Sequence, residues 1–331
     1  MFSTLPYLLL FGWMMFFSVA VSVSSVHWLG MWAGAEINLI CFIPLIIYAG
    51  SISESESAVK YFIFQAAASA VLIFGSLISF RLTFSWEVCT GSYGLLLVVL
   101  GLLVKLGAAP FHWWVPDVMS GLAWPAALIL VTWQKVIPLA LLAAATAPAA
   151  VLGTAFLAVL SAVVGGIGIM NQTRLKPLLA FSSVAHVGWL LLGISCSLLS
   201  AVIYFTTYVV LSVILFWGLW TSENSNMHSI SGVCAPSEGG AVMLCLLSMG
   251  GLPPLLGFIP KWFVFVQAAD SGVYLVMVGM ILGSLLSIYC YLALAFIFFT
   301  SVSPKDLKLS AFLGASLLVN ALVGPLMFLL F

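Results

Sequence analysis

Four ionisable side chains lie inside long apolar stretches of this sequence, and these residues are the best placed to do chemistry. Glu36, Lys105, Lys135 and Lys261 are each flanked by uncharged residues, and we expect Lys135 near the centre of a helix with no break. An ionisable group at the centre of a membrane helix costs roughly 2.5–3.5 kcal/mol on insertion scales. Four such groups would cost on the order of 10 kcal/mol, comparable with the whole stability of a typical domain. Charges kept at that cost indicate ion translocation.

Proton transfer is the chemistry that fits these residues best. Burial disfavours the charged form of a lysine or a carboxyl group, and an opposite charge nearby restores it. Sodium would need several carboxylate or carbonyl oxygens at one site, and Glu36 is the one acid evident inside a predicted span. Histidine titrates near neutrality, so His112 and His186 are either further relay members or hydrogen-bonded packing residues. The structural alternative for the lysines is pairing or, for Lys261, a side chain that reaches the membrane surface.

Composition excludes a soluble protein. Lys and Arg together number nine and Asp and Glu nine, which is 5% of 331 residues, against about 25% in an ordinary soluble domain. The balance of signs leaves no basic face for nucleic acid. The six cysteines form no CxxC pair, which argues against a zinc or iron–sulfur site, and we expect no metal or cofactor in this chain.

Hydropathy predicts an all-α polytopic membrane protein. Ser, Asn, Pro and charged residues divide the chain into about eleven apolar segments of membrane length. The predicted spans are 4–23, 28–49, 60–80, 92–121, 124–142, 148–170, 177–197, 200–221, 239–268, 274–298 and 309–330. Two of them, 92–121 and 239–268, are longer than one crossing needs and contain KLGAAPFHWWVP and GGLPPLLGFIPK. The Gly and Pro residues in these segments predict two broken helices.

The positions of the two breaks predict an inverted repeat. The broken helices are the fourth and ninth spans, so they cross the membrane in opposite directions. Oppositely oriented five-helix units with corresponding broken helices are typical of ion-coupled transporters. We therefore predict a single transmembrane domain over 1–331, with repeats at 4–142 and 148–298 and a C-terminal helix at 309–330.

Loop charges predict the orientation. The loops on the side of the N-terminus hold five positive residues, and those on the opposite side hold Arg81. The five are Lys60, Arg174, Lys176, Lys305 and Lys308. The positive-inside rule then places the N-terminus on the cytoplasm-like side and the C-terminus opposite. The N-terminal residues MFSTLPYLLLFGW contain no positively charged leader, so we expect no import signal.

Six blocks of sequence follow one another in a familiar order. They are SSVHWLGMWAGAEINLICFIPL (24–45), SAVKYFIFQAAAS (57–69), KLGAAPFHWWVPDVMSGL (105–122), TWQKVIPLALL (132–142), NQTRLKPLLAFSSVAHVGW (171–189) and GGLPPLLGFIPKW (250–262). Together they resemble the subunit 2 family of mitochondrial NADH:ubiquinone oxidoreductase, respiratory complex I. The residues after 262 resemble the family mainly in hydropathy.

The resemblance implies an antiporter-like subunit of the membrane arm. It implies a proton relay through Glu36, Lys105, Lys135 and Lys261, which are the charges identified above from insertion cost, and it also includes His112 and His186 less securely. It further implies a subunit of an H⁺-translocating NADH:ubiquinone reductase with no redox centre of its own, because NADH, FMN, iron–sulfur clusters and ubiquinone belong to other subunits.

The resemblance also implies partners and a location. The partners would be neighbouring antiporter-like and small membrane-arm subunits of complex I, together with membrane lipid. The chain would cross the mitochondrial inner membrane, with its N-terminus in the matrix and its C-terminus in the intermembrane space. A standalone sodium/proton antiporter and a purely structural membrane scaffold are the alternatives.

Overall fold

The helices are described for most of the chain. The computed structural model describes residues 5–83, 93–145, 151–222 and 236–301, and the single residues 314, 316 and 320. Every element of regular secondary structure longer than one residue in these ranges is a helix, which confirms the predicted all-α class. The predicted span 309–330 lies almost entirely outside the described residues. The chain divides between Val151 and Leu152 into two compact units, and each unit is treated by itself.

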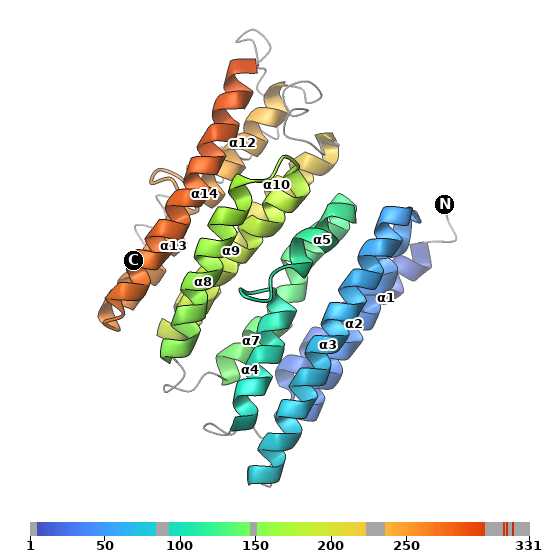
Figure 1. Ribbon diagram of the computed structural model, residues 1–331. Coiled ribbons are helices and arrows are strands. Elements are labelled where there is room, and N and C mark those ends of the chain that lie inside the picture. The colour runs from blue at the N-terminus through green and yellow to red at the C-terminus, as the bar shows by residue number, and fades with distance from the viewer. Residues whose placement is uncertain are drawn as a thin grey trace. The chain divides into compact units, whose positions relative to one another are not determined.

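Unit 1 contains the first seven α-helices. Its elements are α1 (Leu5–Ser24), α2 (Trp28–Ile46), η1 (Ile47–Ala49), α3 (Ile52–Thr83), α4 (Tyr93–Leu106), α5 (Trp114–Gly121), α6 (Trp124–Val131), η2 (Trp133–Lys135) and α7 (Val136–Ala145), where η marks a 3₁₀ helix. The helices α1, α2 and α3 lie side by side (Figure 1), and α3 also packs against α4 and α5. The helix α4 packs against η2 and α7. These contacts place α3 beside both α2, which carries Glu36, and α4, which carries Lys105.

Unit 2 contains the remaining described helices. They are α8 (Val151–Met170), α9 (Leu175–Cys196), α10 (Leu198–Ser222), α12 (Pro236–Gly250), α13 (Phe258–Asp270) and α14 (Tyr274–Ser301). The helix α9 packs against α10, α13 and α14, and α12 packs against α10 and α14. A Cβ atom at Gly188 would lie 2.6 Å from the carbonyl oxygen of Ala158. Glycine therefore lets α9 approach α8 this closely, as small residues do between membrane helices.

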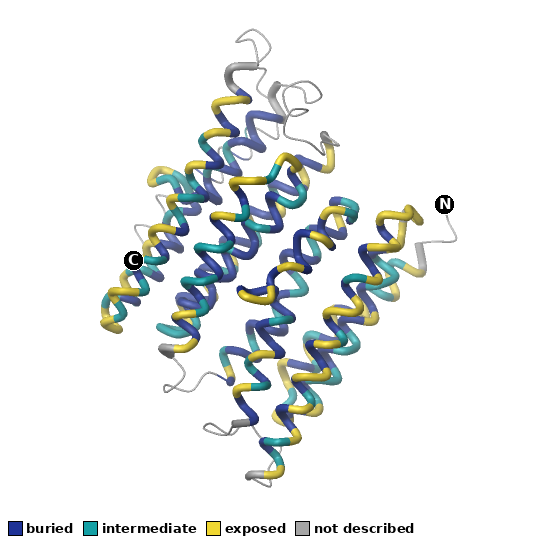
Figure 2. The backbone as a smooth tube through the Cα atoms, in the orientation of Figure 1, coloured by how far each residue is buried: buried dark blue, intermediate teal, exposed yellow. Residues whose placement is uncertain are grey.

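The outer faces of the helices are apolar. Eight helices or helix runs of the described part have the length and hydropathy needed to cross a membrane. Large apolar side chains are exposed on them, among them Trp13 at 73% and Phe17 at 66% on α1 and Leu275 at 87% on α14. Figure 2 shows exposed and buried residues alternating along α1, α2 and α3. A polytopic membrane protein places such faces against lipid or against neighbouring subunits.

One helix begins earlier than predicted. The predicted span starts at residue 60, whereas α3 begins at Ile52. The Glu54 N–H donates to Ser51 Oγ at 3.2 Å, and the Ser51 N–H donates to Glu54 Oε2 at 3.4 Å. This reciprocal pair is a capping box, which satisfies backbone donors at a helix N-terminus. Hydropathy misses these turns because their residues, SESES, are polar.

Another helix is interrupted where the sequence predicted no break. The span predicted over 124–142 is α6, the 3₁₀ turn η2 and α7, and Lys135 is the last residue of the turn. Pro138 follows three residues later and lacks the N–H that would bond the carbonyl of Gln134 four residues before it. The expectation of an unbroken helix around Lys135 was therefore wrong, and the missed signal is this proline.

Candidate functional site

Lys105 lies in the last turn of α4, where the chain breaks before α5. Gly107 has a φ of 69°, a left-handed conformation that glycine adopts at little cost. The Gly107 N–H donates to the Val104 carbonyl at 3.1 Å, and the Ala108 N–H donates to the Leu103 carbonyl at 3.1 Å. This pair of bonds is a Schellman motif. The first predicted break is therefore confirmed, and it ends α4 directly after the lysine.

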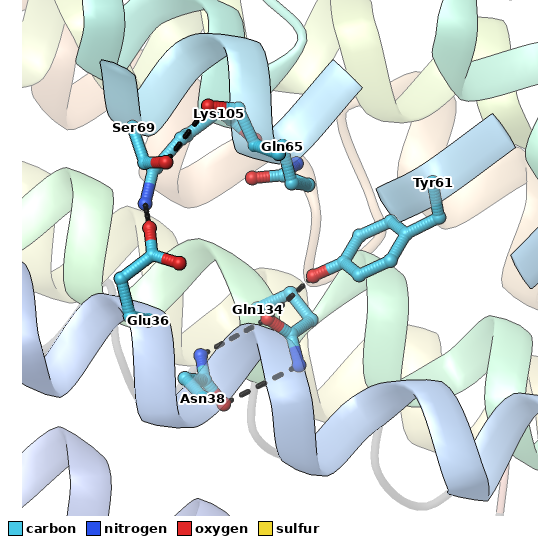
Figure 3. A network of polar contacts seen from close by, with 8 residues as sticks. Glu36, Asn38, Tyr61, Gln65, Ser69, Lys105 and Gln134 are labelled. Carbon is cyan, nitrogen blue, oxygen red and sulfur yellow. Dashed lines mark hydrogen bonds and ion pairs between the residues drawn. The ribbon is translucent and has the colours of Figure 1, made fainter. Parts of the chain in front are cut away.

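Glu36 and Lys105 come together from α2 and α4. Lys105 Nζ lies 3.7 Å from Glu36 Oε1, and the two side chains are 4% and 22% exposed, respectively. Figure 3 shows the carboxylate and the ammonium pointing toward one another. Glu36 Oε1 is buried and accepts no hydrogen bond from the described residues. The two charges are thus in Coulombic contact but beyond hydrogen-bond distance, and the lysine keeps a compensating charge only while the carboxylate stays near.

Lys135 lies on the interruption between α6 and α7. Its side chain is buried at 5% exposure, and its N–H donates to the Thr132 carbonyl at 3.3 Å within the 3₁₀ turn. Because α4 packs against η2, the turn that carries Lys135 lies next to the helix that carries Lys105. Both lysines therefore belong to one buried region of unit 1.

A half-buried amide next to Lys135 uses all its hydrogen-bonding groups. Gln134 Oε1 accepts from Asn38 Nδ2 at 3.0 Å and from the Tyr61 hydroxyl at 3.1 Å. Gln134 Nε2 donates to Asn38 Oδ1 at 3.4 Å and to Met15 Sδ at 3.6 Å. An amide side chain offers two acceptor sites and two donors, so the Gln134 amide is fully satisfied. Its partners come from α1, α2 and α3, and Figure 3 shows the amide pair with Asn38 and the contact with Tyr61.

The inward face of α3 carries three polar residues at helical spacing. Tyr61, Gln65 and Ser69 follow one another every four residues and are 1%, 7% and 7% exposed. Gln65 Nε2 donates to the backbone carbonyl of Lys105 at 3.2 Å. Neither this stripe nor Gln134 was predicted from the sequence, although polar residues at i, i+4 and i+8 of an apolar helix share one face.

His112 lies in the segment that separates α4 from α5. It is 5% exposed, and its Nδ1 lies 3.2 Å from the carbonyl oxygen of Pro110. A carbonyl oxygen only accepts, so Nδ1 carries the hydrogen in this contact. The ring also lies 4.6 Å from the ring of Trp113. These contacts fix the imidazole inside the break, as expected for a packing residue and equally for a relay member.

Lys261 occupies the second broken helix in a different way. It lies in the first turn of α13 and is 9% exposed. Its Nζ donates to the carbonyl oxygens of Gly250 at 2.6 Å and Met249 at 3.3 Å, which end α12. The carboxyl end of a helix carries partial negative charge, so the backbone is what compensates this lysine. It makes no ion pair with any described residue, and its side chain is held in the break instead of reaching the membrane surface.

Two glycines make this arrangement possible. Gly251 has a φ of 86°, and a Cβ there would lie 2.9 Å from Lys261 Cδ and 3.0 Å from Lys261 Nζ. A Cβ at Gly257 would lie within 1.7 Å of the Ser248 carbonyl oxygen. The sequence GGLPPLLG therefore ends α12, starts α13 and leaves the space that the lysine occupies.

His186 and Lys261 line one small cavity. Its walls also include Ser182, Trp189 and Tyr291, and its volume is about 10 Å³, near the minimum for one water molecule. The Tyr291 hydroxyl is buried with no hydrogen-bond partner among the described residues. His186 Nδ1 lies 2.8 Å from the Tyr204 hydroxyl of α10, and this contact orients the ring.

The structure thus forms one pair in each unit from the candidate residues. Glu36 meets Lys105 in unit 1, and Lys261 shares a cavity with His186 in unit 2. The described residues contain no group of three His, Cys, Asp or Glu side chains able to hold a metal ion. The described part of the chain offers charge-bearing side chains and polar contacts, which are the means of moving protons.

This chain has relatives among known proteins. The family of transmembrane proteins described as NADH:quinone oxidoreductase/Mrp antiporter matches residues 25–287. The chain belongs to this family. Curated relatives include NADH-ubiquinone oxidoreductase chain 2 of Xenopus laevis, 38% identical over 86% of this chain and 84% of that protein. Chain 2 of Branchiostoma floridae is 36% identical over 95% of this chain and 94% of that protein.

Solved structures are similar over nearly the whole chain. A chain of respiratory complex I from Thermus thermophilus with bound aureothin matches with a TM-score of 0.86 and 29% identity, over 98% of this chain and 79% of that chain. A chain of the Mrp complex from Dietzia matches with a TM-score of 0.79 and 16% identity, over 89% of this chain and 60% of that chain. At 16% identity the second similarity shows the fold alone.

Proposed function

We propose that this chain is the chain 2 type of membrane-arm subunit in NADH:ubiquinone oxidoreductase, complex I, and that it translocates protons. The reaction with NADH and quinone takes place in other subunits, which carry FMN and the iron–sulfur clusters. The chain acts within that H⁺-translocating enzyme as a multi-pass protein of the mitochondrial inner membrane. The matches with relatives of that name extend over most of this chain and over most of each relative.

One observation carries the proposal of a proton pathway. The Glu36 and Lys105 side chains meet at 3.7 Å inside a membrane-spanning unit, and the lysine is 4% exposed. When the carboxylate is near, Lys105 is stable as an ammonium; when it moves away, the buried charge is uncompensated and the proton leaves the nitrogen. The proton would pass toward Lys135 on the neighbouring turn and then toward Lys261. His112 and His186 are the candidate members of this relay.

We also propose the architecture predicted from the sequence. The chain would be a single domain of eleven spans, with repeats at 4–142 and 148–298 and a C-terminal helix at 309–330. Two features support the repeat: each unit contains a helix broken by Gly and Pro residues with a buried lysine beside the break, and the boundary at Val151 lies close to the expected one. The loop charges support an N-terminus in the matrix and a C-terminus in the intermembrane space.

A standalone sodium/proton antiporter is the second candidate. This chain belongs to a family that includes Mrp antiporters, and its fold is similar to that of a chain of the Mrp complex. Purification in a gentle detergent separates the two. A complex I subunit leaves the membrane together with hydrophilic redox subunits and NADH dehydrogenase activity, whereas a standalone antiporter does not.

Lys135 tests the relay most directly. If Lys135 only packs, Lys135→Met is neutral or stabilising, because methionine has similar volume and no buried charge. If it relays protons, Lys135→Met assembles but lowers NADH-driven quinone reduction and proton uptake together. Lys135→Arg also fails in that case, because a guanidinium does not release its proton at accessible pH.

The measurement uses vesicles with intact complex I, normalised to the amount of assembled complex. Lys60→Met is the matched control, since it removes a lysine that is 41% exposed and paired with Glu56 at 2.7 Å on the surface of α3. We expect it to retain full turnover. Full activity in both Lys135 variants would remove this residue from the pathway and favour the scaffold.

A further inference from the structure

The turn that carries Lys135 is held by a side chain with no charge. Gln134 is the residue before Lys135 in η2, and its amide is bonded to Asn38, Tyr61 and Met15. Three of these four side chains, Asn38, Tyr61 and Met15, are at most 3% exposed. A satisfied polar network in an apolar interior is rigid, because breaking any of its bonds leaves a buried group unpaired. The position of η2 is thereby tied to α1, α2 and α3.

Two of these helices, α2 and α3, also contact the ion pair. Asn38 lies two residues after Glu36 on α2, and Tyr61 lies one turn before Gln65 on α3. Gln65 donates to the backbone carbonyl of Lys105. Two short routes therefore lead from Gln134 to the pair, one through α2 to the carboxylate and one through α3 to the backbone of the lysine (Figure 3).

We propose that Gln134 is a positioning residue whose amide clamp makes the Glu36–Lys105 pair and the Lys135 turn move together. This inference rests on the proposed relay and names the contact that transmits movement from its first step to its second. When α2 shifts and carries Glu36 away from Lys105, Asn38 moves with the helix and pulls on the Gln134 amide. The 3₁₀ turn, in which the Lys135 N–H donates to the Thr132 carbonyl at a long 3.3 Å, is the segment that yields.

The clamp differs from ordinary helix packing in a way that can be measured. A residue that only packs lowers the amount of assembled complex and acts independently of Lys135. A residue that acts through Lys135 has no further effect once Lys135 is replaced, because energetic effects of residues in one network do not add. Non-additivity with Lys135→Met is thus the decisive readout.

The experiment compares Gln134→Leu, Lys135→Met and the double variant in intact complex I. Leucine keeps a similar volume and removes the whole amide. We expect turnover and proton uptake per assembled complex to fall about tenfold in Gln134→Leu, within the range for residues of one hydrogen-bond network. The double variant should be no slower than Lys135→Met alone.

A length-conserving exchange provides the rescue. Asn38→Gln combined with Gln134→Asn keeps two amides facing each other and should recover most of the turnover. Thr207→Val is the matched control for loss of a buried polar group: Thr207 is 5% exposed and its hydroxyl bonds carbonyls of its own helix at 2.9 and 3.0 Å. It should keep full turnover.

Each failure points to a different premise. Full activity in Lys135→Met refutes the relay, and with it the role given to Gln134. A slow Lys135→Met together with a fully active Gln134→Leu refutes the clamp alone, as does a double variant in which the two losses multiply. If Gln134→Leu fails to assemble, Tyr61→Phe removes one bond of the clamp, and full turnover in that variant overturns the inference.

Discussion

Replacing Gly251 by alanine should displace Lys261 without touching the lysine itself. The added Cβ would lie 2.9 Å from Lys261 Cδ and 3.0 Å from Nζ. Carbon atoms in good contact are about 3.5–4.0 Å apart, so the lysine has to shift by roughly 0.5–1 Å. The shift acts on the ammonium that bonds the Gly250 carbonyl at 2.6 Å.

The size of the effect has two parts. A left-handed φ costs a non-glycine residue about 1–2 kcal/mol, and Gly251 has a φ of 86°. A hydrogen bond to a charged group contributes about 1.5–3 kcal/mol, and its loss corresponds to roughly a tenfold to hundredfold change in rate if the bond is needed during turnover. The first part affects stability and assembly, and the second affects turnover.

Gly272→Ala separates these parts. Gly272 has a φ of 75°, and a Cβ there would meet no atom within 4 Å. Both variants should therefore assemble to a similar, slightly reduced level. NADH-driven proton uptake per assembled complex should fall about tenfold or more in Gly251→Ala and stay unchanged in Gly272→Ala. Equal turnover in the two variants would refute the role given to the lysine's backbone contacts.

Three further substitutions test the remaining contacts. Glu36→Gln keeps the size of the side chain but leaves Lys105 without a compensating charge, so turnover should fall about tenfold or more in assembled complex; unchanged proton uptake would exclude Glu36 from the relay. Gly257→Ala should prevent assembly, because its Cβ would overlap the Ser248 carbonyl; immunoblots of native gels report this directly. Trp114→Phe removes the hydrogen bond of 3.0 Å from the indole N–H to the Val104 carbonyl near the end of α4. It should lower stability by about 1 kcal/mol and leave proton uptake per assembled complex unchanged.

Most helices and the two breaks rich in Gly and Pro were predictable because their causes are local. Apolar length determines where a helix can cross the membrane, and the Gly and Pro residues of GGLPPLLG end one helix before the next begins. The candidate lysines were also found from the sequence, since the cost of a buried charge depends only on its surroundings in the span. Their roles in proton transfer stay predictions until the substitutions are made.

The hydrogen-bond partners of Gln134 and Lys261 lie in other segments of the chain and were not predictable. Asn38 and Gln134 are 96 positions apart, and neither segment contains a feature that identifies the other as its partner. The free carbonyls of Met249 and Gly250 have a local cause, because Pro253 and Pro254 lack the N–H groups that would bond them in a continuous helix. Nothing local identifies Lys261 as their partner. The 3₁₀ turn at Lys135 had a local cause in Pro138, but a proline near a helix end is compatible with a continuous helix as well.

Lys105 and Lys261, which lie at the two predicted breaks, are held by partners that differ in how easily they can be removed. Glu36 can be neutralised by a proton or replaced by a single mutation, so the hold on Lys105 can be switched off. The carbonyls of Met249 and Gly250 belong to the main chain; no proton neutralises them at physiological pH, and no side-chain substitution at those positions deletes them. Lys261 is released by a change of backbone course or by a side chain that takes its space, as in Gly251→Ala. Sequence variation around Lys261 is thus constrained through the backbone, whereas around Lys105 it is constrained through charge as well as through Gly107.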